Sequence, residues 1–178
     1  GWFDRIVGLK YFNVFGPNED HKAGMRSLLN KAFPRVRETG VLQLFASGRD
    51  DYEDGEQCRD FIYVKDAVAM TGYFVTNRSV GGLYNIGTGR AQTWNELGHG
   101  LFAALGRKTR IEYMPMTEEL VNSYQYRTRA DMSKVRAAGC THVCYALEDA
   151  VADYVQSYLM VDRRVGEISA EDDCGMVR

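Results

Sequence analysis

The stretch RIVGLKYFNVFGP (residues 5–17) constrains the fold more than any other part of the sequence. It is a nearly continuous apolar run, rich in β-branched and aromatic residues, and it stops at Gly16-Pro17. A strand with one face in water alternates apolar and polar residues, whereas a strand that helices cover on both faces does not. The run therefore predicts a strand buried on both faces of a parallel sheet, which places the chain in the α/β class.

The rest of the chain alternates between strand-like and helix-like patterns. The expected elements are a helix from 22 to 38 that Pro34 breaks or kinks, a strand at 41–47, a polar loop at 48–57, a strand that becomes a helix within 59–77, a strand closed by a glycine turn at 81–89, a helix at 93–106, a strand at 110–116, and helices at 131–140 and 146–160. Asp66 is placed to cap the second helix, and Thr93 with Glu96 forms a capping pair for the third. This order predicts a mixed or parallel sheet with helical cover.

The 178 residues can form one compact body. We expect this body to span residues 1–160, because residues 161–178 lack periodicity and are typical of a flexible tail. The sequence begins with Gly1 rather than Met, and a strand pattern is already in progress at Arg5. The chain is therefore expected to be part of a longer protein.

Composition and charge argue against nucleic acid and membrane partners. Net charge is -2, so the chain carries no field that would hold a polyanion, and we expect no nucleic acid partner. No apolar run approaches the length of about 18 residues needed to cross a bilayer, and the N-terminus lacks the pattern of a secretion signal. We expect a cytoplasmic protein with no membrane partner, whose cysteines are reduced thiols.

Several polar residues stand where ligands bind in open α/β sheets, beyond the carboxyl ends of strands. Asn13 lies inside the apolar strand, where it is either a satisfied core amide or a ligand contact. His21 and Lys22 follow the strand and are either solvated loop charges or chemical groups. Arg59 precedes the strand FIYV and could bind a phosphate with two parallel hydrogen bonds, or form a surface pair with Asp60.

Other motifs carry weaker signals. NIGTG (85–89) lacks the spacing of a phosphate-binding loop and is more typical of a tight turn. Tyr124 lies in a polar stretch that is either a binding loop or an ordinary connection. The segment CTHVC (140–144) brings together two thiols and an imidazole, but zinc needs a fourth ligand, and we expect no metal site.

Taken together, YFNVFGP, HK, RDFIYVKDAV, LYNIGTG and RADMSKVRAAG resemble the C-terminal half of an extended short-chain dehydrogenase/reductase that acts on a nucleotide sugar. Within that superfamily, GPNEDHK narrows the resemblance to the ADP-L-glycero-D-manno-heptose 6-epimerases. The resemblance implies the last parallel strands of a Rossmann-type fold with a small α/β substrate-binding subdomain. It also implies a role in making the heptose of the lipopolysaccharide core.

The resemblance implies a redox mechanism at C6 of an ADP-heptose. NADP, or NAD, would take a hydride from C6 and return it to the opposite face, which requires an acid/base group on each side of the carbon. Lys22 corresponds to one of these groups and would also contact the cofactor. The other is the tyrosine of a Tyr-x-x-x-Lys helix, which this sequence lacks, as it lacks the glycine fingerprint of the cofactor fold. The cofactor would be held mainly by an N-terminal part outside these residues, in a protein that forms a homo-oligomer.

The same resemblance assigns binding roles. Val14 would line the cofactor and Tyr124 would reach the sugar or its phosphates. The substrate-binding positions that it implies are Asn13, Gly24, Lys31, Phe45, Ala46, Ser47, Gly48, Arg59 and Tyr124. At Gly24 the family has a small hydroxyl residue and at Lys31 often a histidine, so these two positions depart from its pattern.

Two other functions remain open from the sequence. The chain could come from another nucleotide-sugar epimerase or dehydratase, such as one acting on UDP-galactose, which needs no lysine at position 22. It could also be a non-catalytic module that binds an ADP-sugar. The resemblance favours the heptose enzyme, and these 178 residues alone are expected to be inactive.

Overall fold

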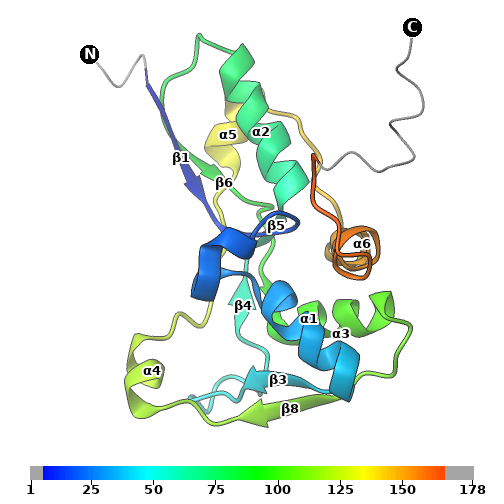
Figure 1. Ribbon diagram of the computed structural model, residues 1–178. Coiled ribbons are helices and arrows are strands. Elements are labelled where there is room, and N and C mark those ends of the chain that lie inside the picture. The colour runs from blue at the N-terminus through cyan, green and yellow to red at the C-terminus, as the bar shows by residue number, and fades with distance from the viewer. Residues whose placement is uncertain (1–5, 167–178) are drawn as a thin grey trace, which may run out of the picture.

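The computed structural model describes residues 6–166, and its strands form four pairs (Figure 1). Three pairs are parallel: β1 (Val7–Tyr11) with β6 (Gly82–Ile86), β2 (Asn13–Phe15) with β5 (Phe61–Tyr63), and β3 (Leu42–Phe45) with β8 (Ile111–Met114). The fourth pair, β4 (Cys58–Arg59) with β7 (Gln92–Thr93), is antiparallel. The expectation of mixed or parallel strand pairing is confirmed, but the described strands form four two-stranded sheets rather than one sheet.

The helices lie between and around these pairs. In chain order they are the 3₁₀ helix η2 (Asp20–Met25), α1 (Leu28–Thr39), α2 (Val64–Thr76), α3 (Trp94–Ala104), α4 (Glu118–Ser123), α5 (Ser133–Ala137), α6 (Leu147–Tyr154) and the π-helical turn η3 (Val155–Leu159). The β1–β6 pair lies at one end of the molecule with α2 and α5, and the β3–β8 pair lies at the other end (Figure 1). None of the helices in the described part of the chain has the length and apolar character that crossing a bilayer requires.

The apolar run at 5–17 forms two strands rather than one. Phe12 donates its backbone N–H to Ile86, whereas Asn13 donates to Asp60, so the chain passes from one partner strand to another between these residues. The prediction of a strand buried on both faces is wrong for β1, in which Tyr11 is 45% exposed. Among the described residues, β1 pairs only with β6, and the helix it contacts is α2.

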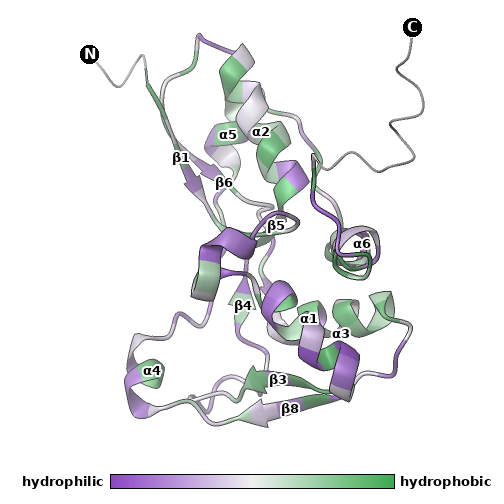
Figure 2. Ribbon diagram, viewed as in Figure 1, coloured by the Kyte–Doolittle hydropathy of each residue, from purple (hydrophilic) through white to green (hydrophobic). Residues whose placement is uncertain are grey.

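Two apolar cores meet at β5. Phe61 and Tyr63 face the first core, which α1, α3, β3 and α6 complete, whereas Ile62 faces the second core, beneath α2 and β6. This alternation follows from the period-2 geometry of a strand. All three β5 residues are buried, as a strand between two cores requires, and the apolar colouring of α3 and β3 can be followed in Figure 2.

Helix α1 begins later than predicted and passes through Pro34. Ser27 caps it by accepting a hydrogen bond from the backbone N–H of Asn30, and the helix ends at Gly40, whose φ of 71° suits a left-handed cap. The residues expected to form its first turns instead form η2, which Ala23 interrupts with a φ of 48°. Pro34 lies inside the helix, so of the break or kink predicted there the break is wrong.

The prediction that Asp66 caps α2 is wrong. The N-cap position is Tyr63, which makes no side-chain cap bond, and Asp66 lies in the first turn with its carboxylate fully buried. That carboxylate accepts a hydrogen bond from the backbone N–H of Tyr145 and pairs with Nε2 of His142 at 2.7 Å. Asp66 therefore binds a distant loop, which a sequence pattern cannot reveal.

The capping pair of α3 is confirmed. Thr93 accepts a bond from the backbone N–H of Glu96, whose carboxylate in turn accepts one from the backbone N–H of Thr93. Of the expected tail, the described residues 161–166 contact the body: Asn18 exchanges two hydrogen bonds with the backbone of Val165, and Arg164 pairs with Asp20. Residues 167–178 lie outside the described residues.

Candidate functional site

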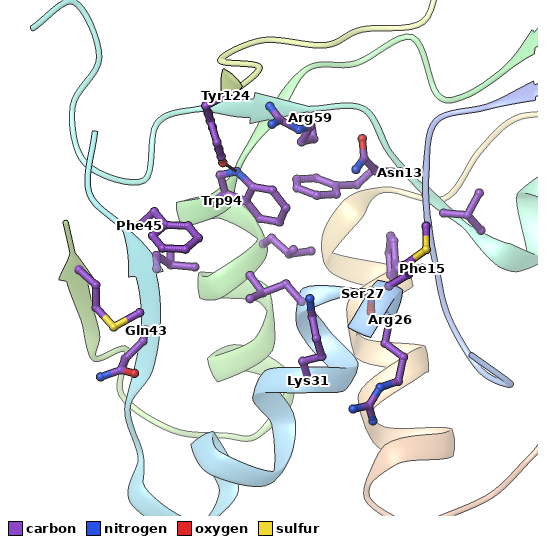
Figure 3. A pocket seen from close by; sticks show the side chains of 17 residues that line it. Asn13, Phe15, Arg26, Ser27, Lys31, Gln43, Phe45, Arg59, Trp94 and Tyr124 are labelled. Carbon is purple, nitrogen blue, oxygen red and sulfur yellow. Dashed lines mark hydrogen bonds between the residues drawn. The ribbon is translucent and has the colours of Figure 1, made fainter. Parts of the chain in front are cut away.

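A cavity of about 360 Å³ lies between β2, β3, β4 and the N-terminal ends of α1 and α3 (Figure 3). Its wall combines apolar side chains with a few polar groups, as small-molecule sites commonly do. The residues that line it are Asn13, Val14, Phe15, Met25, Arg26, Ser27, Leu28, Lys31, Gln43, Leu44, Phe45, Arg59, Phe61, Trp94, Leu97, Met114 and Tyr124. Six of them are positions that the sequence resemblance assigned to ligand binding.

Arg59 is the main electrostatic feature of this cavity. It is 9% exposed, its guanidinium lies 5.0 Å from the ring centre of Tyr124 and 5.8 Å from that of Trp94, and Nη1 donates to the Cys58 carbonyl. Among residues 6–166, no carboxylate pairs with it. The alternative of a surface pair with Asp60 is therefore wrong, and the cavity holds a desolvated cation with donors to spare.

The aromatic neighbours of Arg59 hold one another in place. Trp94 Nε1 donates to the hydroxyl of Tyr124 at 2.9 Å, and the Trp94 ring packs edge-on against Phe61. Burial raises the pKa of Tyr124, so its phenol is neutral at ordinary pH, and burial lowers the pKa of Arg59. An arginine remains protonated after such a shift, so the site stays positively charged.

Asn13 and Lys31 lie on opposite sides of the cavity (Figure 3). Asn13 is exposed, and no hydrogen bond of its side chain occurs among the described residues, so the interpretation as a satisfied core amide is wrong. Lys31 extends from α1, and its Nζ donates to the carbonyl of Gly24 at 3.3 Å. Both side chains can donate hydrogen bonds to a bound polar molecule.

Phe45 and Val14 line the cavity at the carboxyl end of β3 and within β2. Phe45 is 43% exposed and opposes Met114 in the β3–β8 register, so the two form an open apolar surface. Val14 also lines a second, apolar hollow between β1 and α2. The wall thus offers one surface suited to a planar ring and one to an aliphatic contact.

Ala46, Ser47 and Gly48 do not line the cavity but shape the loop beside it. The Ala46 carbonyl accepts a bond from Gln57, and the Ser47 backbone N–H donates to Asp54 at 2.7 Å. A Cβ at Gly48 would come within 2.5 Å of Val121, so only glycine fits there without movement. These contacts hold the segment against the following loop.

Lys22 and Gly24 lie outside the cavity wall. Both are exposed in η2, and a Cβ at Gly24 would meet nothing within 4 Å. Met25 and Arg26, the next residues along, do line the cavity. The structure therefore places the segment that carries Lys22 at the rim and does not bring the Lys22 side chain to the wall.

The NIGTG turn is occupied by a carboxylate of the chain itself. Asp60 is fully buried and accepts hydrogen bonds from the backbone N–H groups of Thr88, Gly89 and Ala130, and from the Thr88 hydroxyl. These four bonds use the amides that a phosphate would need. The turn is therefore structural, as its spacing predicted.

The segment 140–144 forms a small polar cluster with Asp66. Candidate ligand atoms of Asp66, His142 and Cys144 lie within 4.8 Å of one another. Burial raises the pKa of the Cys144 thiol to about 11, with the Asp66 carboxylate adding to the shift. His142 and Asp66 already pair with each other, so the cluster serves the fold.

Sequence patterns alone missed Trp94 and Met114. Trp94 is three residues before Leu97, on the face that α3 turns to the core, so its pattern is that of a core residue. Met114 ends the strand beside Phe45, and the rule that ligands bind beyond carboxyl ends of strands could have identified it.

Comparisons with known proteins agree with the resemblance found in the sequence. The model of the NAD dependent epimerase/dehydratase family matches residues 4–87. The ADP-L-glycero-D-manno-heptose-6-epimerase of Nitratidesulfovibrio vulgaris is 48% identical over 159 residues, which are 89% of this chain and 49% of that protein. The enzyme of the same name from Alkalilimnicola ehrlichii is 43% identical over 153 residues, which are 86% of this chain and 47% of that protein.

A solved structure extends the likeness to three dimensions. The Helicobacter pylori ADP-L-glycero-D-manno-heptose-6-epimerase has a TM-score of 0.67 and 28% identity, and the match covers 85% of this chain and 43% of that one. The chain spans about half the length of the curated relatives it matches. These findings confirm an α/β fold that is similar to part of the fold of the extended short-chain dehydrogenase/reductase epimerases.

Proposed function

Since this chain is a relative of part of the ADP-L-glycero-D-manno-heptose 6-epimerases, we propose that it binds the nucleotide sugar in such an enzyme. The observation that carries the proposal is Arg59, a buried cation without a carboxylate partner in the described chain, set in the wall of a cavity of suitable size. A diphosphate supplies the anionic oxygens that match its planar fork of donors. Asn13 would then bind the sugar, and Phe45 with Met114 would contact the nucleotide base.

The reaction that this proposal implies needs a nicotinamide cofactor, as the description of the matching family indicates. The cofactor, NADP or NAD, would accept the C6 hydride and return it to the other face of the transient ketone. Val14 would contact the cofactor, and the rest of its site would be supplied by a polypeptide beyond these residues. We further propose a cytoplasmic homo-oligomer built around residues 1–160.

Lys22 is the proposed acid/base group on one face of C6. Its position at the exposed rim, three residues before Met25 of the cavity wall, allows the side chain to approach a bound sugar from the solvent side. The other acid/base group would come from the cofactor-binding half.

Nucleotide binding tests the first part of the proposal. ADP-heptose added to this chain is expected to change the fluorescence of Trp94, which packs against Arg59. Replacing Arg59 by Gln should weaken binding roughly 10- to 100-fold, because hydrogen bonds to charged groups are worth about 1.5–3 kcal/mol. Isothermal titration calorimetry gives the affinities, and Arg110→Gln, at an exposed arginine that does not line the cavity, is the matched control.

Equal affinity of the Arg59→Gln variant and the original chain would overturn this role. Competition between ADP-heptose and UDP-galactose separates the heptose enzyme from a 4-epimerase. A chain that prefers UDP-galactose would support the second function, which the sequence left open.

Turnover tests the role of Lys22. In a protein that carries this chain with a cofactor-binding half, Lys22→Ala is expected to lower kcat by roughly 10²- to 10⁴-fold, the usual contribution of a general acid/base group. The affinity for ADP-heptose should change far less, since Lys22 lies outside the wall. Interconversion of the two epimers is followed by chromatography, and His21→Ala serves as the control. Unchanged turnover of Lys22→Ala would contradict the role of Lys22 as an acid/base group in the heptose epimerase reaction.

A further inference from the structure

The segment between β2 and α1 is closed at its base by one carboxylate. Glu19 precedes η2, and Ser27 follows it as the cap of α1. The Glu19 carboxylate accepts a hydrogen bond from the Ser27 backbone N–H at 2.7 Å and another from the Ser27 hydroxyl at 2.6 Å. Residues 20–26 thus form a loop whose two ends are fixed to each other.

This carboxylate is also fixed to the C-terminal helix. Glu19 is 2% exposed, and it accepts a third hydrogen bond, at 2.9 Å, from the hydroxyl of Tyr154 on α6. Burial raises the pKa of Tyr154, so its hydroxyl remains a donor. Within the part of the chain that the structure describes, no lysine or arginine pairs with Glu19. A buried carboxylate satisfied only by neutral donors is a costly arrangement, and three such donors hold it in one position.

From Tyr154 the hydrogen bonds continue toward the cavity. Asn30, which is 7% exposed, donates to the Tyr154 hydroxyl at 3.0 Å and accepts a bond from Arg26 at 3.1 Å. Arg26 lines the cavity, as do Met25, Ser27 and Leu28 (Figure 3). Two residues of this side of the cavity are therefore connected to Glu19: Ser27 directly, and Arg26 through Tyr154 and Asn30.

The other polar contacts of the loop lie nearer its surface. Asp20 pairs with Arg164 and accepts a hydrogen bond from Asn30, and the carbonyls of Ala23 and Gly24 accept hydrogen bonds from Arg26 and Lys31. The side chains from His21 to Met25 are exposed, and Met25 is 88% exposed. Ala23 has a φ of 48°, which a residue with a Cβ adopts only under strain. The two hydrogen bonds between Glu19 and Ser27 are therefore the contacts that join the ends of the loop to each other.

We propose that Glu19 is a positioning residue, whose buried carboxylate sets the loop 20–26 and the adjoining wall of the cavity for the sugar end of the nucleotide sugar. This inference rests on the proposed function in that it takes the occupant of the cavity to be an ADP-sugar. Glu19 does not touch the ligand. It acts through Ser27 and, by way of Tyr154 and Asn30, through Arg26.

Hydrogen exchange measures the effect on the loop without any ligand. In the Glu19→Ala variant, amide exchange within residues 20–27 is expected to rise at least tenfold, while the amides of the β3–β8 pair keep their protection. Glu19→Gln should restore most of the protection, because its carbonyl oxygen can accept from the Ser27 N–H and its amide can donate to either hydroxyl. Tyr154→Phe removes one donor, keeps the ring in the core and should give an intermediate rise.

The matched control is Asp66→Ala, which removes another fully buried carboxylate that holds a loop. This variant is expected to leave exchange in residues 20–27 unchanged. If loop exchange is equal in Glu19→Ala and the original chain, Glu19 has no effect on the loop and the proposal is overturned. If Asp66→Ala raises loop exchange as much as Glu19→Ala does, the effect is a general loss of stability and the proposal is also overturned.

Binding measurements then distinguish an effect at the sugar end of the ligand from an effect at its nucleotide end. Affinities for ADP-heptose and for ADP are measured by calorimetry with the original chain and each variant. Glu19→Ala should weaken the affinity for ADP-heptose at least tenfold and the affinity for ADP less than twofold. Glu19→Gln should restore most of the affinity for ADP-heptose. Equal losses for both ligands would contradict a positioning role at the sugar end. If the original chain binds neither ligand, the proposed function fails, and the exchange data alone decide whether Glu19 fixes the loop.

Discussion

At the residue scale, buried charged and polar groups explain more of the molecule than its apolar positions do. Asp60 fills the NIGTG turn with four hydrogen bonds, and Glu19 closes the loop before α1 with three. Arg59 differs from both, because among the described residues its side chain is buried with one hydrogen bond, to the Cys58 carbonyl, and no carboxylate partner. Buried polar groups are normally satisfied, so an arginine with spare donors marks the place where a ligand is expected.

Ala23 provides a test of strain in the loop that carries Lys22. Its φ of 48° lies in the left-handed region, and such conformations cost about 1–3 kcal/mol in residues other than glycine. Replacement by Gly should therefore stabilise the chain by about 1 kcal/mol, after the entropy that glycine adds to the unfolded state. Urea denaturation measures the change. Ala32→Gly inside α1 is the control and should destabilise by about 1 kcal/mol. A loss of stability in Ala23→Gly equal to that of the control would contradict strain at Ala23.

At the element scale, hydrogen bonds between elements that are distant in sequence set the relative positions of helices and loops, which secondary-structure propensity does not determine. Asp66 in α2 holds the 142–145 loop, and Asp153 in α6 holds the other side of the α2 start, where it accepts hydrogen bonds from Tyr63 and Lys65. Trp94 begins α3 and also packs against Arg59. Helix α3 therefore contributes to the cavity through its first turn as well as to the core, whereas α2 and α6 use a carboxylate to bind a neighbouring segment.

Asp153 gives a pH dependence whose sign can be derived. Burial acts to raise its pKa, but the hydrogen bonds from Lys65 and Tyr63 outweigh burial, so the pKa lies below the ordinary value of 3.8. A lowered folded-state pKa means that this carboxylate stabilises the fold above pH 3.8 and that its contribution disappears as the pH falls through the folded-state value. Asp153→Asn should thus cost about 1 kcal/mol at pH 7 and progressively less below pH 4.

Urea denaturation at a series of pH values measures this difference. Asp50→Asn, in the exposed loop after β3, is the control and should be close to neutral throughout. A loss in Asp153→Asn that is the same at pH 7 and at low pH would show that packing, and not the charge, accounts for it.

At the scale of the whole molecule, the described chain has a cavity of about 360 Å³ but leaves apolar surface uncovered. Val68 and Val75 on α2 are 65% and 68% exposed, and Leu83 on β6 is 63% exposed. These residues lie near the β1–β6 end, away from the β3–β8 end that contributes Phe45 and Met114 to the cavity (Figure 1). Exposed apolar surface of this kind is typical of a face that another protein segment or subunit covers.

The 178 residues alone are expected to bind an ADP-sugar without interconverting its epimers. Inverting a carbon by oxidation and reduction needs an acid/base group on each face and a bound nicotinamide, and the sequence has no Tyr-x-x-x-Lys motif and no glycine fingerprint. Incubation with ADP-heptose and NADP, followed by chromatography of the two epimers, measures turnover. Epimer formation above the rate of a no-protein control would overturn this prediction. Addition of a cofactor-binding half should restore turnover.

The sequence by itself determined the order and type of most elements, because helix and strand periodicities, the Thr93–Glu96 capping box and the glycine turns depend on neighbours along the chain. It also predicted a ligand role for Asn13 and Arg59 through the resemblance, and both line the cavity. It missed the late start of α1, where Glu19 and Ser27 form a closed loop instead of a helical turn. Only the tertiary structure decided which partners the buried polar groups have. Asp66 accepts a hydrogen bond from a loop some 80 residues away, and Asp60 accepts hydrogen bonds from the NIGTG turn. Arg59 lies against aromatic rings rather than a carboxylate. The physical reason is that these bonds join residues that are distant in sequence, whereas periodicity records only local spacing.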